Sequence, residues 1–330
     1  MTLVIGTDEA GYGPNLGPLV IGATAWQVDA PAATAERVLG TAVGDALTSL
    51  DDASPRVVWR DSKEVYRGGA GRTLLLRSAL AGIAIAHGGV PQSWPALLAI
   101  LGRIGPTTAD TSPEWQTFSD NPLLDASLAA EVHEDATHLT RSLAERGVRL
   151  CRVACTCLYP GTFNALIDRG MNKSDILSRE TLALAAQLAE DLSDPHATTL
   201  IWCDRHGGRK RYAGVIAAAF EAQAVPIQET PTHSAYRLGS DGLFGSQSGG
   251  DTVLEFSVRG EQRPPVAVAS LTAKCVRELT METFNRFWSQ EDANLEPTAG
   301  YPVDAARWRQ QASPTITRLG LDSHQIWRQV

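Results

Sequence analysis

The chain has 330 residues, 43% of them hydrophobic, and a formal net charge of −8. This length suffices for a large buried core in one elaborate domain or two ordinary ones, and no apolar run approaches the roughly 18 residues of a membrane span. The acidic balance argues against a protein that coats nucleic acid through a broad basic surface.

The N-terminal half begins with two strand candidates. Residues 3–8 (LVIGTD) form a short apolar run that ends in an acid, and residues 17–26 form a second run after a glycine-rich connection. Residues 71–88 have the pattern of an amphipathic helix. The stretch 89–147 starts with a segment rich in Pro, Ser and Thr that has no sustained period, so we expect an insertion there.

The C-terminal half alternates between strand and helix patterns. Strands are predicted at 148–159, 197–204 and 252–260, and helices at 171–192, 211–223 and 266–288. Alternation of this kind predicts an α/β protein with a sheet covered by helices. We therefore expect a single domain over 1–330, with a C-terminal helical extension over 285–330.

Cysteine usage and the N-terminus point to a reducing compartment. Met1 leads directly into a strand-like run rather than a signal peptide, and five cysteines, an odd number, suit free thiols. We expect a cytoplasmic protein without membrane contact. Cys151, Cys155 and Cys157 suggest a zinc site as an alternative, although their spacing fits an alternating strand better.

Two of the predicted strands stop on an aspartate. In open α/β sheets the carboxyl ends of the strands line the ligand crevice, so we expect Asp8 and Asp204 to be neighbours. Glu9 would face away from Asp8 on a regular strand, and it reaches the same site only if the strand ends between them. The alternative is that both aspartates merely cap turns.

A further acid lies in the long helix. Ser270, Lys274 and Glu278 follow at four-residue spacing and share one face of a helix that is otherwise apolar enough for the core. A surface salt bridge between Lys274 and Glu278, worth roughly 0.3–0.5 kcal/mol, is the alternative to a functional site. It leaves the apolar surroundings unexplained.

Four carboxylates that converge from two strands and a helix repel one another unless cations lie among them. Oxygen ligands of this kind favour Mg²⁺ or Mn²⁺. The chemistry that most often needs such a site is in-line attack of water on a phosphodiester, with one metal activating the water and a second stabilising the leaving oxygen.

The motifs in their order resemble type 2 ribonucleases H, the ribonuclease HII-like family. The matching segments are DEAGYG at 8–13, DSK at 61–63, FNALIDRGMN at 163–172, ASLTAKCVRELTM at 269–281 and AGYP at 299–302, and the strand-ending Asp204 stands where the family has its third acid. The resemblance implies a ribonuclease H-like fold with a mixed central sheet flanked by helices. It also implies hydrolysis of the RNA strand of RNA/DNA hybrids, or of ribonucleotides embedded in duplex DNA, that leaves a 3′-hydroxyl and a 5′-phosphate.

Site residues follow from the same resemblance. Catalytic and metal-ligand roles are implied for Asp8, Glu9, Asp204 and Glu278. Main-chain groups of the glycine motif would contact a ribonucleotide 2′-hydroxyl, a tyrosine would pack on its sugar, and lysines would lie near phosphates. The substrate-binding residues expected from the resemblance are Gly11, Tyr12, Gly13, Lys63, Lys274 and Tyr301, and the closeness of Arg209 to Asp204 adds a phosphate contact.

The chain departs from the family pattern at several places. Tyr12 replaces an arginine, Glu278 an aspartate and Val303 a threonine, and the stretch 89–147 has no counterpart. A second function therefore stays open, namely a binding module of the same fold for hybrid or branched nucleic acid that cuts weakly or not at all.

Two local alternatives also remain. The glycines of 11–17 suggest a dinucleotide loop, although Pro14 and Pro18 would interrupt the helix that such a loop opens. His206 beside Asp204 is either a proton shuttle or an ordinary loop residue.

Overall fold

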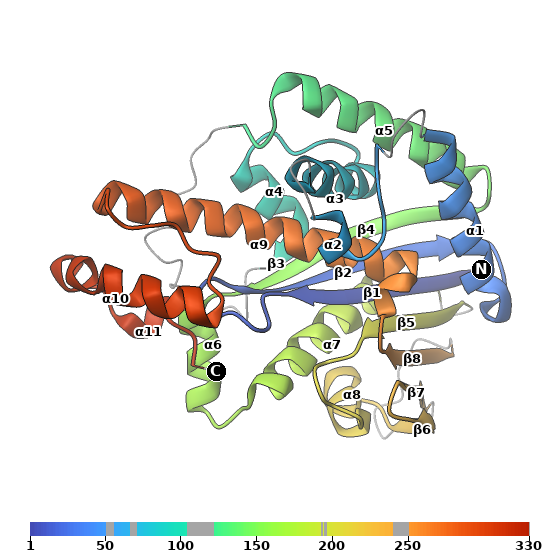
Figure 1. Cartoon of the computed structure of the whole chain (residues 1–330). Helices are drawn as coiled ribbons and strands as arrows, with labels where there is room; N and C mark the ends of the chain where they lie inside the picture. The colour runs from blue at the N-terminus through green and yellow to red at the C-terminus, as the bar shows by residue number, and fades with distance from the viewer. Residues whose placement is uncertain are drawn as a thin grey trace.

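The computed structural model describes residues 1–50, 56–66, 71–103, 122–192, 194, 197–239 and 251–329. Within these residues the chain forms an eight-stranded sheet in the order β3-β4-β2-β1-β5-β8-β7-β6 (Figure 1). The strands are β1 (Thr2–Ala10), β2 (Leu19–Val28), β3 (Gly102–Arg103), β4 (Val148–Leu158), β5 (Thr198–Asp204), β6 (Ala224–Glu229), β7 (His233–Leu238) and β8 (Thr252–Ser257).

The sheet is mixed. β1, β2 and β4 form an antiparallel set, β5 runs parallel to both β1 and β8, and β6, β7 and β8 are antiparallel. Because β1, β5 and β8 are parallel, their carboxyl ends meet at one edge of the sheet. The predicted fold class, an α/β protein with a mixed central sheet flanked by helices, is confirmed.

Helices cover both faces of this sheet (Figure 1). One face carries α1 (Ala32–Leu50), α3 (Gly71–His87), α4 (Trp94–Leu101), α5 (Ala126–Ala144) and α9 (Pro264–Glu291). The other face carries α6 (Pro160–Asp168), α7 (Lys173–Leu192) and α8 (Ala213–Phe220). Two large hydrophobic clusters lie between the sheet and these helices, one on each face.

Helix α9 lies directly on the sheet, and two glycines allow it to do so. A Cβ atom on Gly22 of β2 would lie 2.3 Å from the carbonyl oxygen of Ala269, and one on Gly6 of β1 would lie 2.3 Å from the carbonyl carbon of Pro265. Because the sheet and α3 enclose α9, most of its side chains are buried. This close approach brings Ser270 of α9 to Asp8 of β1.

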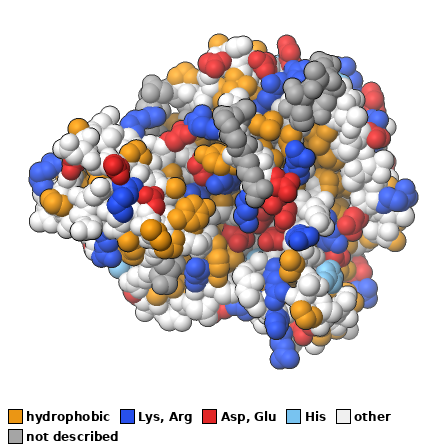
Figure 2. All heavy atoms as spheres, in the orientation of Figure 1, with side chains coloured by type: hydrophobic (Ala, Val, Ile, Leu, Met, Phe, Trp, Pro, Cys, Tyr) orange, Lys and Arg blue, Asp and Glu red, His pale blue; other side chains and the backbone are white. Residues whose placement is uncertain are grey.

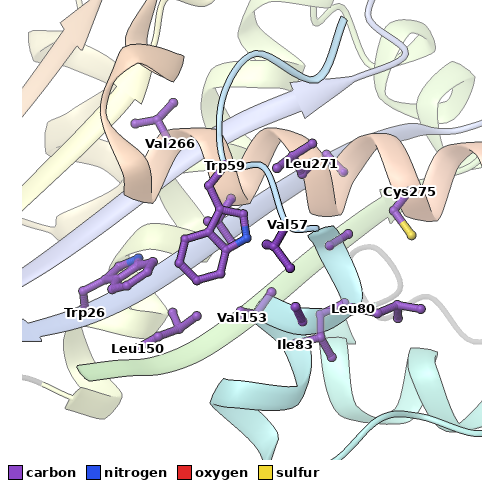
Figure 3. Close-up of a cluster of buried hydrophobic side chains, with 14 of the residues drawn as sticks. Trp26, Val57, Trp59, Leu80, Ile83, Leu150, Val153, Val266, Leu271 and Cys275 are labelled. Carbon is purple, nitrogen blue, oxygen red and sulfur yellow. The ribbon is translucent and has the colours of Figure 1, made fainter. Parts of the chain in front are cut away.

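Aromatic rings fill the space beside α9. Trp26 and Trp59 meet edge to face with ring centroids 5.8 Å apart, and they pack in the cluster that contains Leu271 and Cys275 (Figure 3). Further along the chain, α10 (Pro302–Leu319) and α11 (Ser323–Ile326) cover the C-terminal half of α9, where Trp288 and Trp308 lie 5.0 Å apart. Together with the last residues of α9, these helices lie in the region 285–330 that was expected as a helical extension.

Several elements were not predicted from the sequence. Helix α1 and strands β6 and β7 are additions, and the expected insertion contains α4 and α5. Helix α5 packs on α1 and α3 through residues such as Val132, Leu139 and Leu143, so it belongs to the core. Residues 104–121 of that stretch lie outside the described part. No helix in the described ranges is both long and apolar enough to cross a membrane.

Candidate active site

The structure brings Asp8 and Asp204 together at the carboxyl ends of neighbouring parallel strands. The pairing of β1 with β5 ends at Thr7 and Cys203, and each aspartate is the next residue. The predicted adjacency of these two strands is therefore confirmed.

Strand β1 does not end between Asp8 and Glu9, and in this respect the sequence-based expectation was wrong. The strand continues to Ala10, because its ladder with β2 continues to the pair Ala10 and Val20 after β5 has stopped. The Asp8 carboxylate accepts a hydrogen bond from the Glu9 main-chain N–H at 2.8 Å. Glu9 still acts electrostatically on the same site, since Asp204 raises its pKa.

The three acids repel one another in a half-buried position. Burial and then the charges of Glu9 and Asp204 raise the pKa of Asp8 well above its usual value. Burial and the charge of Asp204 raise the pKa of Glu9 to about 7, while the Lys63 ammonium opposes this shift. Burial also raises the pKa of Asp204, although its Oδ1 accepts a hydrogen bond from the Gly260 N–H at 2.9 Å.

Two further acids that sequence reasoning did not assign to the site lie near Asp204. Asp61 caps α2 (Ser62–Val65) by accepting a hydrogen bond from the Lys63 N–H at 2.8 Å, and its charge raises the pKa of Asp204. Burial, followed by the charges of Asp204 and Asp61, raises the pKa of Glu261. Asp61 stands in the DSK segment already noted, whereas no pattern in the sequence marks Glu261.

Glu278 belongs to a different set of contacts. Its carboxylate accepts hydrogen bonds from the Lys274 Nζ at 2.8 Å and from the Tyr66 hydroxyl at 3.1 Å, and the Arg277 Nη1 lies 3.8 Å away. The Lys274 and Glu278 side chains are only 16% and 22% exposed, so the pair is not the surface salt bridge of the alternative interpretation.

The chemistry of the donors fits a divalent cation. Asp8, Glu9 and Asp204 supply the hard carboxylate oxygens that Mg²⁺ and Mn²⁺ prefer, and a cation would relieve the repulsion that raises their pKa values. Among the residues that the structure describes, no group of three or more His, Cys, Asp or Glu side chains is already drawn together in the arrangement of a metal site. The fit is therefore one of ligand type and charge.

Ser270 of α9 lies beside Asp8. Its hydroxyl forms a hydrogen bond to the Asp8 carboxylate, which lowers the pKa of that group against the larger effect of burial, and its Oγ lies 3.0 Å from the Ser62 Oγ. The chain of contacts from Ser62 through Ser270 to Asp8 links α2, α9 and β1.

If the site has the nuclease activity expected from the sequence, Ser270→Ala should lower the cleavage rate about 10-fold to 100-fold, the usual cost of losing a group that orients a ligand. The matched control is Thr272→Val, because Thr272 is buried in the same helix and its hydroxyl donates only to the Val268 carbonyl at 2.8 Å. Single-turnover rates of the two variants check this prediction, and equal rates would remove Ser270 from the site.

The segment between β1 and β2, residues 11–18, is called the glycine segment below, and its glycines are of two different kinds. Gly11 has a φ of +86°, and a Cβ atom there would lie 2.5 Å from the Pro18 carbonyl oxygen, so the local backbone requires glycine. Gly13 is exposed and a Cβ atom on it would meet no atom within 4 Å. The fold itself does not need glycine at position 13.

The basic and aromatic residues expected to bind substrate differ in their availability. Lys63 is exposed, and Tyr301 is 51% exposed with the Arg277 guanidinium 5.8 Å from its ring. Lys274 is paired with Glu278, and Arg209 forms a salt bridge to Asp175. Figure 2 shows Asp and Glu side chains near the centre of one face, with Lys and Arg side chains around them.

Lys173, at the start of α7, was not identified from the sequence. Its ammonium lies 4.3 Å from the centre of the Tyr12 ring, an arrangement typical of a cation–π contact. Glu9 and Arg209 influence the pKa of Tyr12, so this ring lies between the acids and the basic residues. The signal for Lys173 was its place directly after the FNALIDRGMN segment, which ends at residue 172.

The remaining alternatives are decided by packing. His206 is buried against Tyr212 and Phe256, and burial lowers its pKa to about 3, so it is a neutral core residue. Cys155 and Cys157 are buried in β4. The glycine segment leads from strand to strand rather than into a helix, which contradicts a dinucleotide loop.

No protein-family model matches the chain, and no curated protein matches it. In structure it is similar to the ribonuclease H2 from Pyrococcus horikoshii OT3, with a TM-score of 0.45 and 14% identity over 98% of this chain and 92% of that one. It is also similar to RNase HII in the PCNA:RNase HII complex from Archaeoglobus fulgidus, with a TM-score of 0.41 and 14% identity over 98% and 93% of the chains. A third similar structure is Bst-RNase HIII in complex with Mn²⁺, with a TM-score of 0.45 and 13% identity over 99% and 66%.

Proposed function

We propose that the chain is a metal-dependent endonuclease of the ribonuclease HII-like family. Its substrate is the RNA strand of RNA/DNA hybrids, or a ribonucleotide embedded in duplex DNA. The observation that carries this proposal is the placement of Asp8 and Asp204 at the carboxyl ends of neighbouring parallel strands, with Glu9 next in the chain and the pKa values of all three acids raised by burial and by neighbouring carboxylates. The ordered sequence motifs around these acids support it.

Asp8, Glu9 and Asp204 would hold Mg²⁺ or Mn²⁺, and Glu278 is the fourth ligand expected from the sequence. The metal supplies activation of the attacking water and stabilisation of the leaving oxygen. The residues of the chain orient these groups: Ser270 holds the Asp8 carboxylate, and the Gly260 N–H holds that of Asp204. In-line attack then leaves a 3′-hydroxyl and a 5′-phosphate.

Recognition of the ribonucleotide is assigned to the glycine segment and Tyr301. The open space over Gly13 allows a sugar to approach the main chain, and the exposed Tyr301 ring offers a flat surface for it. Lys63 and Lys173 supply positive charge for the phosphates on either side, while Lys274 and Arg209 would first have to exchange their carboxylate partners.

We expect Gly13→Val to lower cleavage at a single ribonucleotide about 100-fold, because its methyl groups occupy the space that the sugar needs and misplacement by 1 Å has a cost of this size. The melting temperature should stay close to that of the parent, since a side chain at position 13 meets no protein atom. Gly89→Val, also at an open position, is the control and should cleave normally. Normal cleavage by Gly13→Val would restrict the glycines to a role in the turn.

Lys173 is expected to contact a phosphate in place of the arginine that Tyr12 replaces. Lys173→Gln should weaken binding to all duplexes and reduce the slope of log K against log salt by up to about one unit. Lys210→Gln is the control, because Lys210 is also an exposed lysine whereas the ammonium over the Tyr12 ring is that of Lys173. Equal salt slopes for the two variants would contradict the contact.

The function is tested with labelled all-DNA, single-ribonucleotide and hybrid duplexes, each with and without Mg²⁺ or Mn²⁺. The expected result is cleavage of ribonucleotide-containing strands only when a metal is present. Products with a 2′,3′-cyclic phosphate would contradict the proposal, because they require attack by the ribose hydroxyl. Tight binding of hybrids without cleavage would favour the binding module.

A further inference from the structure

The C-terminal tail, residues 324–329, packs beneath the glycine segment. The Arg328 Nη2 donates hydrogen bonds to the carbonyl oxygens of Gly11, at 2.5 Å, and Pro14, and the Arg328 main-chain N–H donates to the Asn15 carbonyl at 2.8 Å. Trp327 adds a β-bridge to Leu16. A residue 317 positions away in sequence thus holds the segment that directly follows Asp8 and Glu9.

The tail is itself held by α6. The fully buried Asn164 side chain donates to the carbonyl oxygens of His324 and Trp327, both at 2.7 Å, and accepts from the Gln329 N–H at 2.7 Å. The position of Arg328 relative to the glycine segment is therefore fixed from two sides.

The burial of the Arg328 side chain is unfavourable for the stability of the fold. Its side chain is fully buried, and the Nε and Nη1 atoms have no hydrogen-bond partner among the described residues. Burial and the nearby Arg277 charge lower its pKa to about 9. A buried guanidinium that faces carbonyl oxygens and the Phe163 ring, 5.3 Å away, is less favourable than an apolar side chain of similar volume.

The contacts of Arg328 act on the orientation of one peptide group. The Gly11 carbonyl and the Tyr12 N–H belong to the same planar trans peptide, so a group that holds the carbonyl also sets the direction of the N–H. Gly11 has a φ of +86°, and because glycine has no Cβ atom its own backbone preferences do little to hold this conformation. Both hydrogen bonds come from Nη2, whose two N–H groups the planar guanidinium holds in fixed directions, whereas a lysine ammonium rotates freely on a flexible stem.

We propose that Arg328 is a positioning residue that sets the main-chain conformation of residues 11–14 for recognition of the ribonucleotide. This inference rests on the proposed function, because the glycine segment is the part assigned to reading the sugar. Arg328 touches neither the acids nor, being fully buried, the substrate. Its effect passes through the carbonyl oxygens of Gly11 and Pro14.

The test compares Arg328→Met and Arg328→Lys with the parent in three measurements: melting temperature, single-turnover cleavage of a single-ribonucleotide duplex, and affinity for an all-DNA duplex. For Arg328→Met we expect an unchanged or raised melting temperature, unchanged affinity for DNA, and a rate lower by about 10-fold to 100-fold, as for other groups that orient a site. Arg328→Lys should fall between Arg328→Met and the parent. Arg309→Met is the control, because Arg309 lies 4.8 Å over the Trp327 ring on the exposed side of the tail.

A readout without substrate separates this inference from the proposed function. Amide hydrogen exchange at Gly11, Tyr12 and Gly13 should accelerate in Arg328→Met and not in Arg309→Met, whether or not the parent cleaves. Unchanged exchange together with parental cleavage would overturn the positioning role. A lower cleavage rate together with a lower melting temperature and a lower affinity for DNA would also overturn it, since Arg328 would then be only structural. A parent that never cleaves, with exchange accelerated as expected, would overturn the nuclease assignment and leave the effect on the segment in place.

Discussion

If the chain has the proposed activity, replacing Asp8 or Asp204 with asparagine is expected to lower the cleavage rate by about a thousandfold or more, because the carboxylates and the metal that they would hold supply several kcal/mol of transition-state stabilisation. Asparagine keeps the shape of the side chain and removes the charge that a divalent cation requires. Single-turnover cleavage of a hybrid duplex in saturating Mg²⁺ measures the loss. Asp191→Asn, at an exposed position on α7, is the control and should cleave as the parent does.

The same two variants should keep or gain thermal stability. The pKa values of both aspartates are raised in the folded chain, first by burial, so their ionised forms destabilise the fold at neutral pH and this cost disappears as the pH falls and they become protonated. The neutral asparagine removes that cost at every pH. A large fall in melting temperature for both variants would show that the aspartates are structural, and the nuclease proposal would then lose its central observation.

The sequence predicted that Asp8 and Asp204 lie at one edge of the sheet because the relevant signals are local. Each of two apolar runs ends on an aspartate, and the rule that parallel strands meet at their carboxyl ends brings Asp8 and Asp204 together. The apolar character of 266–288 likewise predicted a buried helix, which α9 is. The close approach of α9 to β1 explains why this helix has so few exposed positions.

What the sequence could not predict depends on contacts between distant segments. Strand β6 was missed because it is an edge strand with almost every side chain exposed, so it has no alternating pattern, and it contains Pro226. Glu261 and Arg328 have no local feature that separates them from ordinary charged residues. Only the packing of β5 beside β8, and of the tail beside α6, brings them to the site.

Glu278 is the site residue for which the sequence and the structure give different partners. The motif predicts a metal ligand, whereas the structure pairs its carboxylate with the Lys274 ammonium at 2.8 Å and the Tyr66 hydroxyl at 3.1 Å. The two sets of partners are compatible if binding of the metal and substrate draws Lys274 to a phosphate and releases the Glu278 carboxylate. In that case Glu278 pairs with Lys274 in the free protein and with the metal in the complex.

We therefore expect Glu278→Gln to lower cleavage about 100-fold, since the amide lacks the charge that Mg²⁺ binding needs and leaves the Lys274 ammonium without its counter-charge. Glu278→Asp should retain much of the activity and shift the preference from Mg²⁺ toward Mn²⁺, because Mg²⁺ tolerates less distortion of its octahedral coordination. The measurement is single-turnover cleavage as a function of the concentration of each metal.

The control is Glu282→Gln, one turn further along α9. Glu282 also forms an ion pair, with Arg72 at 2.6 Å, but its side chain is 39% exposed, so an exposed pair of this kind contributes about 1 kcal/mol or less to stability and nothing to cleavage. If Glu278→Gln and Glu282→Gln both cleave as the parent does, Glu278 is only the partner of Lys274. The site would then rest on Asp8, Glu9 and Asp204. If both variants instead lose melting temperature in proportion to their loss of rate, α9 needs these ion pairs for folding and the ligand role of Glu278 is contradicted.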